Sequence, residues 1–115
     1  MLRLNWVKCS GSWCSLETVN LNNIKTQGVY VIWHASTGHN VVRVGQGDIV
    51  TRLNEHRNDP KILRHAKKGN LLVTWAAVDA AYRDGVERYL ADRYSPLEGV
   101  RYPEVPPRAV NLPGQ

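Results

Sequence analysis

The chain has 115 residues, of which 43% are hydrophobic and 22% are charged. This length predicts one domain over residues 1–115 without room for a second, and the composition excludes a disordered chain. Fifteen lysines and arginines against ten acidic residues give a net charge of +5, which favours a partner that carries phosphate groups.

The excess of positive charge is concentrated in one stretch. Between residues 43 and 68, seven basic residues accompany three acidic ones, so the rest of the chain is close to neutral. A local excess favours a binding face over a general contribution to solubility. The basic residues of this stretch are Arg43, Arg52, Arg57, Lys61, Arg64, Lys67 and Lys68.

Residues 1–27 are only weakly patterned. Cys9 and Cys14 lack the CxxC spacing and are too few for a four-ligand zinc site. They can form one short disulfide or remain free, and we expect reduced thiols. No apolar run has the length of a signal peptide or a membrane span, which predicts a cytoplasmic protein without a membrane partner.

A β-hairpin is the first clear element. Residues 28–33 (GVYVIW) are β-branched and aromatic, residues 35–40 have the composition of a turn, and residues 41–44 (VVRV) predict a second strand. The sequence Gly45-Gln46-Gly47 is expected to end that strand.

Two helices are predicted after the hairpin. The first has Asp48 as its N-cap and runs to about Arg57 with apolar residues along one side. Asp59 and Pro60 are a typical cap and first position of the second, which is expected to end at Gly69.

A covered strand and a third helix complete the predicted elements. Residues 71–78 (LLVTWAAV) are a continuous apolar run, and Asp79 is expected to cap the helix that follows. Five prolines between residues 96 and 113 exclude a further helix, so the tail is extended or looped. The apolar face of the third helix is expected to carry Tyr82, Val86, Tyr89 and Leu90.

Two triplets resemble the paired signature of the GIY-YIG nuclease family. They are Gly28-Val29-Tyr30 and, twelve residues later, Arg43-Val44-Gly45. The resemblance covers residues 28–112 and implies an α/β fold, with a small, mainly antiparallel three-stranded sheet flanked by helices. Further residues at family-like spacing are Arg52, His56, Glu87 and Asn111.

The resemblance also implies an activity. It is that of a metal-dependent endonuclease, which hydrolyses phosphodiester bonds in DNA with Mg²⁺ or Mn²⁺ as cofactor. Water would attack in line and a 3′-oxygen would leave. Because the chain has no room for a separate DNA-reading module, we expect low sequence specificity, unless a homodimer or a DNA-targeting partner supplies it.

Three residues take their roles from the resemblance alone. Tyr30 would deprotonate the attacking water, which for a phenol requires positive charge nearby. Glu87 would be the one protein ligand of the metal, and Asn111 would steady the site. The alternatives are a core aromatic for Tyr30, an ion pair with Arg83 for Glu87, and a turn for Asn111.

Arg52 and His56 also make chemical sense by themselves. Four residues apart on a helix, they project from one side, where an arginine can hold a phosphate oxygen and a histidine can relay a proton. Arg43 stands where the family has a tyrosine, and we interpret it as a phosphate ligand or as a charge that activates the base. The alternatives are a solvated charge for each arginine and a half-buried packing residue for His56.

A DNA-binding face is predicted on the second helix, at Lys61, Arg64, Lys67 and Lys68, with a merely solvated face as the alternative. Rival functions are an inactive DNA-binding module on the same scaffold and a domain that binds an acidic protein. The nuclease hypothesis requires Arg52 and Glu87 on the same side of the sheet. One concave surface is expected to unite Tyr30, Arg43, Arg52, His56 and Glu87.

Overall fold

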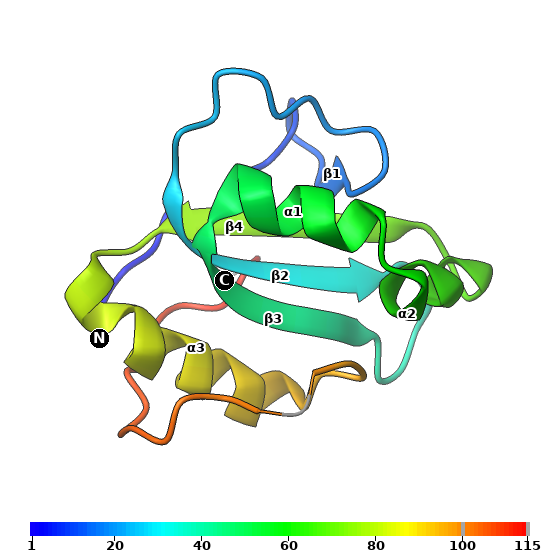
Figure 1. Cartoon of the computed structure of the whole chain (residues 1–115). Helices are drawn as coiled ribbons and strands as arrows, with labels where there is room; N and C mark the ends of the chain where they lie inside the picture. The colour runs from blue at the N-terminus through cyan, green and yellow to red at the C-terminus, as the bar shows by residue number, and fades with distance from the viewer. Residues whose placement is uncertain (100, 115) are drawn as a thin grey trace.

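The computed structural model describes residues 1–99 and 101–114 and has an α/β fold. Its four-stranded antiparallel sheet has the order β1-β4-β2-β3 and is covered by helices (Figure 1). The strands are β1 (Cys14–Ser15), β2 (Gln27–His34), β3 (Val41–Asp48) and β4 (Leu71–Ala77).

The expectation of three strands was therefore wrong by one. Strand β1 comes from the weakly patterned N-terminal stretch and pairs with β4 at Cys14↔Val73 and Ser15↔Leu72. Two residues are too few to show a period of two, so this strand depends on its long-range partner and leaves no local signal.

The hairpin of β2 and β3 is confirmed, but Gly45 and Gly47 do not end β3, which continues to Asp48. Gly45 lies opposite Tyr30 in the register, and a Cβ atom on Gly45 would lie 2.1 Å from the Tyr30 hydroxyl oxygen. Gly47 has a φ of +128°, which disfavours other residues. Within β3, these two glycines leave space for neighbouring side chains. The prediction that they end the strand rested on their composition alone, which does not distinguish the two cases.

Helix α1 (Ile49–Arg57) begins as predicted, because the Asp48 side chain accepts a hydrogen bond from the Thr51 N–H at 3.1 Å. Helix α2 (Pro60–Leu63) has the predicted cap at Asp59. It is short and passes into the 3₁₀ helix η1 (Arg64–Lys67), where one continuous helix was expected.

Helix α3 (Ala80–Tyr94) follows β4 and buries Val86 and Leu90 as predicted. Tyr82 was expected on the apolar face and is instead 41% exposed, with the Arg108 guanidinium 5.0 Å from its ring centre. Asp79 occupies the N-cap position without a side-chain cap bond. The described part of the proline-rich tail contains no helix, as predicted, and Val110 forms a parallel bridge with Leu2.

Each face of the sheet has its own core, because residues of β2 point alternately to either side. Tyr30 and Ile32 pack beneath α1, whereas Val29 and Val31 pack against α3. Figure 1 shows α1 and α3 on opposite sides of the sheet. Strand β3 is an outer strand, so both helices lie next to the same edge.

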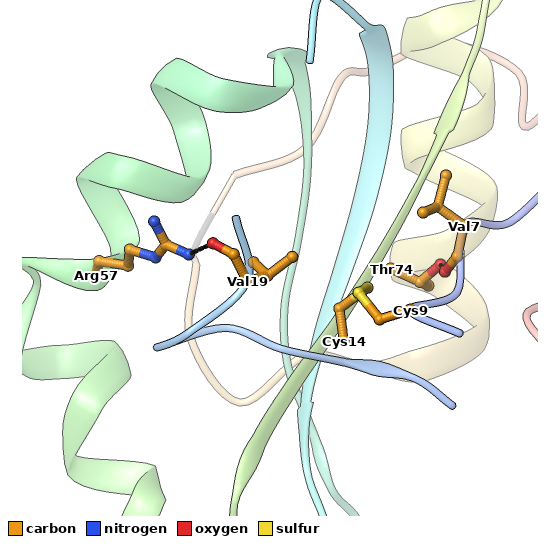
Figure 2. The surroundings of a disulfide bond; sticks show 6 residues. All are labelled: Val7, Cys9, Cys14, Val19, Arg57 and Thr74. Carbon is orange, nitrogen blue, oxygen red and sulfur yellow. Dashed lines mark hydrogen bonds between the residues drawn. A yellow bond between two sulfur atoms is a disulfide. The ribbon is translucent and has the colours of Figure 1, made fainter. Parts of the chain in front are cut away.

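Cys9 and Cys14 form a disulfide, with their Cα atoms 5.1 Å apart, so the expectation of reduced thiols was wrong (Figure 2). A tight turn brings them together: the main chains of Cys9 and Ser12 exchange two hydrogen bonds. Ser10 and Gly11, between them, both have positive φ, which is the pattern of a type I′ turn.

The N-terminal segment is fastened on both sides of the disulfide. The Thr74 hydroxyl donates to the Val7 carbonyl at 2.8 Å, and the Arg57 guanidinium donates to the Val19 carbonyl (Figure 2). The Arg57 Nε also donates to the Leu16 carbonyl at 2.7 Å. Disulfides are most common in oxidising compartments, and the cytoplasmic location stays a prediction. No helix in the described part of the chain is long and apolar enough to cross a membrane.

Candidate functional site

A buried tyrosine–histidine pair lies between the sheet and α1. The Tyr30 hydroxyl is 2.6 Å from the Nε2 atom of His56. Tyr30 reaches this place from the middle of β2, and His56 lies one turn after the buried Leu53 on the side of α1 that faces the sheet. The pairing depends on Gly45, across which the phenol ring lies.

The protonation of this pair follows from its burial. Burial, with Arg43 acting in the same direction, lowers the pKa of His56 to about 4, so this imidazole is neutral at pH 7. Burial raises the pKa of Tyr30 to about 12, although the charges of Arg43 and Arg52 oppose the shift. Tyr30 therefore keeps its proton, and the hydrogen bond joins a neutral phenol to a neutral imidazole. The phenol is the donor when the imidazole carries its proton on Nδ1.

This result bears on the expected role of Tyr30. Of the positive charges expected to favour a phenolate, those of Arg43 and Arg52 act on Tyr30, but the desolvation of the phenol has the larger effect. With these two charges alone the phenol stays protonated, and its hydrogen bond to His56 offers a route for passing a proton on. The role of Tyr30 as the base stays a prediction.

Arg43 faces α1, because it lies opposite Ile32 in the hairpin register. Its Nε atom is buried and has no hydrogen-bond partner among the described residues. A buried guanidinium N–H without an acceptor is costly and fits an anionic ligand close by. The Arg43 charge acts on both members of the Tyr30–His56 pair and on Glu87.

Gln46 joins the two helices at the sheet edge. Its Nε2 donates to the Glu87 carboxylate at 3.0 Å and to the Asp84 carboxylate at 2.7 Å. Its main-chain carbonyl accepts a hydrogen bond from the Arg52 Nε at 3.1 Å. One residue of β3 thus orients the predicted metal ligand on α3 and the predicted phosphate ligand on α1.

The expectation that Arg52 and Glu87 lie on the same side of the sheet was wrong, since α1 and α3 cover opposite faces. Arg52 and Glu87 nevertheless meet at Gln46. This is possible because β3 is the outer strand of the described sheet. The tail lies along the start of β3, where Leu97 and Glu98 donate to the carbonyls of Val41 and Val42, whereas Gln46 lies near its other end. The condition that the nuclease hypothesis set from the sequence, one side of the sheet for both residues, is therefore not met. What the two residues share instead is Gln46 at the outer edge of β3, so a nuclease site would have to bind its phosphate across this edge, where one concave face was expected.

Glu87 is half-buried, and burial raises the pKa of its carboxyl group, while the Gln46 hydrogen bond and the Arg43 charge oppose the shift. A desolvated carboxylate is stabilised by a cation. The described residues contain no group of three histidine, cysteine or acidic side chains able to hold a metal. Besides Glu87, the carboxylate of Asp84 lies at the same Gln46 amide, and the metal role of Glu87 stays a prediction.

Asn111 is not part of this cluster. Its side chain is buried and bonded to the main chain of Leu4, accepting from the N–H at 2.6 Å and donating to the carbonyl at 3.0 Å. It fastens the tail to the N-terminal segment. Its predicted role in steadying the site is thus replaced by one in joining two distant parts of the chain.

The predicted DNA-binding face lies on α2 and η1 and is only partly available. Arg64 pairs with Glu98 at 2.5 Å, and the Lys68 Nζ lies 3.3 Å from the Nδ1 of His65. Lys61 and Lys67 are exposed. Of the four basic residues predicted to form this face, Arg64 therefore has its charge offset by an acidic side chain.

Sequence reasoning missed Gln46 and Tyr102. A Cβ atom on Gly99 would lie 2.8 Å from the Tyr102 hydroxyl and 3.1 Å from an Arg43 terminal nitrogen, so this tyrosine is a neighbour of Arg43. For Gln46 a signal existed: strand alternation puts it on the face opposite Arg43, towards α3. For Tyr102, in an irregular tail, no periodic signal exists.

Acid should destabilise this fold between pH 6.5 and 4.5. Burial is the main cause of the lowered pKa values of His56 and His34 in the folded protein. As the pH falls below 6.5, the ordinary pKa of histidine, the unfolded chain therefore binds a proton at each imidazole before the folded protein does. The stabilisation is complete above pH 6.5 and is lost as the pH falls towards 4. The hydrogen bonds from His65 and Arg64 lower the pKa of Glu98, so this carboxylate adds to the loss of stability only below pH 4.5, the ordinary pKa of a glutamate.

Thermal unfolding across this pH range tests the expectation. His56 accounts for about 3 kcal/mol at most of this loss in the free energy of unfolding, since one pKa unit corresponds to about 1.4 kcal/mol. The raised pKa of Glu87 works against it. The His56→Gln variant should show a shallower fall of the melting temperature than the parent. Equal slopes for the two proteins would contradict the assignment.

Comparisons of the chain with protein-family models, with curated proteins and with solved structures found no match. The function must therefore be argued from the chemistry of the cluster at the β3 edge.

Proposed function

We propose that this protein is a metal-dependent endonuclease that hydrolyses phosphodiester bonds in DNA. The observation that carries the proposal is the convergence of five side chains from four elements on the outer part of β3. They combine a proton-relay pair, two guanidinium groups and one desolvated carboxylate. These are the Tyr30–His56 pair, Arg43, Arg52 and Glu87.

Tyr30 and His56 would act as one unit that removes a proton from the attacking water. The Tyr30 oxygen accepts the water proton while its own proton passes to the Nε2 of His56. This route avoids a free phenolate, which burial makes unfavourable. The neutral imidazole required for it is the form that prevails at pH 7.

Arg43 and Arg52 would bind the scissile phosphate. A guanidinium group matches the geometry of phosphate oxygens and stabilises the charge that grows on them in the transition state. Arg43 replaces the tyrosine of the family that the chain resembles, and its charge acts on Tyr30, His56 and Glu87. Arg52 is exposed and therefore open to DNA.

Glu87 would hold a divalent cation, with Gln46 fixing the orientation of its carboxylate. Bound Mg²⁺ or Mn²⁺ would supply Lewis-acid stabilisation of the phosphate and of the leaving 3′-oxygen. Low sequence specificity is part of the proposal, with a homodimer or a DNA-targeting partner as possible sources of selectivity.

An inactive DNA-binding module is the second candidate function. The raised pKa of Tyr30 favours it, because a tyrosine that only completes a buried hydrogen bond needs no catalytic role. The two candidates differ in one measurement, which is Mg²⁺-dependent nicking of supercoiled and branched DNA by the purified chain. Nicking that EDTA abolishes supports the nuclease, and binding without nicking at any Mg²⁺ or Mn²⁺ concentration supports the module.

The basic face makes a separate prediction. Replacing Lys67 and Lys68 together with alanine should weaken DNA binding to a similar degree for all sequences. The dependence of log K on log[salt] should become flatter by about one unit for each phosphate that the protein no longer binds. Fluorescence anisotropy at several salt concentrations measures both quantities.

Lys25→Ala is the matched control for this prediction, since Lys25 is exposed and lies outside α2 and η1. It should leave the affinity and the salt dependence unchanged. If the double variant behaved like this control, the two lysines would belong to a solvated face that does not touch DNA.

A further inference from the structure

A second feature that suits nucleic acid lies away from the β3 cluster, around Trp13. A cavity of about 220 Å³ is lined by aromatic and apolar side chains, among them Trp13, Trp33 and Tyr94. A second hollow of about 400 Å³ adjoins it and shares Trp13, but is lined by Arg3 and Lys8. The indole of Trp13 thus separates an aromatic hollow from a basic one.

The aromatic walls have a fixed arrangement. The rings of Trp13 and Trp33 meet edge to face, with centres 5.5 Å apart and planes at 83°. The Lys8 Nζ lies 4.6 Å from the centre of the Trp13 ring, in a cation–π contact. Both tryptophans are only half-buried, so part of each indole stays accessible.

The disulfide restricts the main chain around Trp13. Trp13 directly precedes Cys14, which is buried in β1 and bonded to Cys9, while the bond from Thr74 to Val7 fastens the chain before the loop (Figure 2). The loop therefore holds Lys8 and Trp13 in a defined relation. A pre-arranged aromatic surface loses little conformational entropy when a ligand stacks on it.

Charge identifies the class of ligand. Among the described residues, both charged side chains that line the basic hollow are positive, and none of those lining the aromatic hollow is charged. A planar, apolar ring next to an anionic group would satisfy both hollows at once. Stacking platforms flanked by positive charge are the general means by which proteins bind unpaired nucleotides.

We propose that the Trp13 surface, defined as Arg3, Lys8, Trp13 and Trp33, binds an unpaired nucleotide of single-stranded DNA. The base would enter the aromatic hollow beside Trp13 and Trp33. Its phosphate would face Lys8 and Arg3. This inference rests on the proposed function only in taking DNA as the ligand.

The location of the Trp13 surface connects it with the cluster at β3. Tyr94, which lines the aromatic hollow, lies seven residues after Glu87 on α3, a rise of about 10 Å along the helix. An unpaired nucleotide near a cleavage position would thus be within reach of both places. The surface would favour DNA with a single-stranded segment over uniform duplex.

The test measures the binding of three DNA probes to the full chain by fluorescence anisotropy in EDTA, which prevents cleavage. The probes are a short single-stranded oligonucleotide, the same oligonucleotide with abasic sites, and a duplex. Trp13→Ala should weaken binding of the intact single strand by about tenfold, the scale of one missing base stack, and leave the abasic and duplex probes unchanged. Trp13→Phe should restore most of the binding, because a ring for stacking remains.

Tyr82→Ala is the matched control, since Tyr82 also has a cationic side chain over its ring, that of Arg108, and is exposed, but lies outside the Trp13 surface. It should leave all three affinities unchanged. Equal affinities of Trp13→Ala and the parent for the intact single strand would overturn the inference, as would an equal loss for the abasic probe. Displacement of the strand by polyglutamate as effectively as by unlabelled single strand would indicate an acidic protein partner and would also overturn it.

Cleavage is scored separately, so that the two proposals fail separately. Trp13-dependent binding by a parent chain that nicks no DNA would overturn the nuclease alone. If the parent chain nicks DNA but its binding of single-stranded DNA does not depend on Trp13, only the proposal for the Trp13 surface is overturned.

Discussion

Glu87→Gln is expected to reduce DNA cleavage by at least about 10²-fold, the scale seen when one preorganised electrostatic group is removed. Glutamine preserves the shape of the side chain but lacks the charge that a hard cation requires. DNA affinity should stay the same or rise slightly, because a negative charge near the phosphates is gone. Single-turnover cleavage and anisotropy on the same DNA measure both effects, and additional Mg²⁺ should restore little of the rate.

Asp84→Asn is the control for this variant. Asp84 lies one turn before Glu87 on α3, binds the same Gln46 amide and is exposed. The same loss of charge there should change the rate by far less, since no role in the cluster requires that carboxylate. If both variants lost activity equally, general electrostatics would be responsible. If Glu87→Gln cut DNA as fast as the parent, the metal assignment would be wrong.

Tyr30→Phe is expected to slow cleavage by about 10²–10³-fold, within the range of a missing general base. The phenyl ring fills the same buried space across Gly45, so the fold should persist, as thermal unfolding can verify. His56→Ala should cost a similar factor. Because the two side chains would relay one proton through one hydrogen bond, the double variant should be scarcely slower than either single variant.

Tyr102→Phe is the matched control, since Tyr102 is another half-buried tyrosine near Arg43 and its hydroxyl bonds only weakly, at 3.5 Å, to the Glu98 carbonyl. It should retain most of the activity. Rates that fall multiplicatively in the Tyr30–His56 double variant would show that the two residues act independently. Unchanged cleavage in Tyr30→Phe would assign this tyrosine to the core.

Much of the fold could be predicted from the sequence, because the patterns that specify its main elements are local. The β2–β3 hairpin, the caps at Asp48 and Asp59 and the apolar strand β4 each depend on residues within a few positions of one another. Such signals arise from backbone propensity, from capping hydrogen bonds and from the period of the apolar residues.

The candidate site residues were likewise identified from their spacing in the sequence. Their arrangement in space could not be predicted in this way. Twenty-six residues separate Tyr30 from His56 and forty-one separate Gln46 from Glu87, so only the packing of α1 and α3 around β3 brings them together. Arg52 and Glu87 meet although their helices lie on opposite faces, because β3 is the outer strand. No local pattern in β3 indicates that it is the outer strand of the sheet.

By itself, then, the sequence determined the order of the main elements, the starts of α1 and α2 and the set of side chains with suitable chemistry. Only the tertiary structure decided the protonation of the Tyr30–His56 pair, since burial outweighs the nearby positive charges. It also decided the disulfide and the role of Asn111, both of which follow from contacts of the N-terminal segment. The physical reason is common to these cases: desolvation and long-range contacts depend on which surfaces meet, and short-range patterns do not encode that.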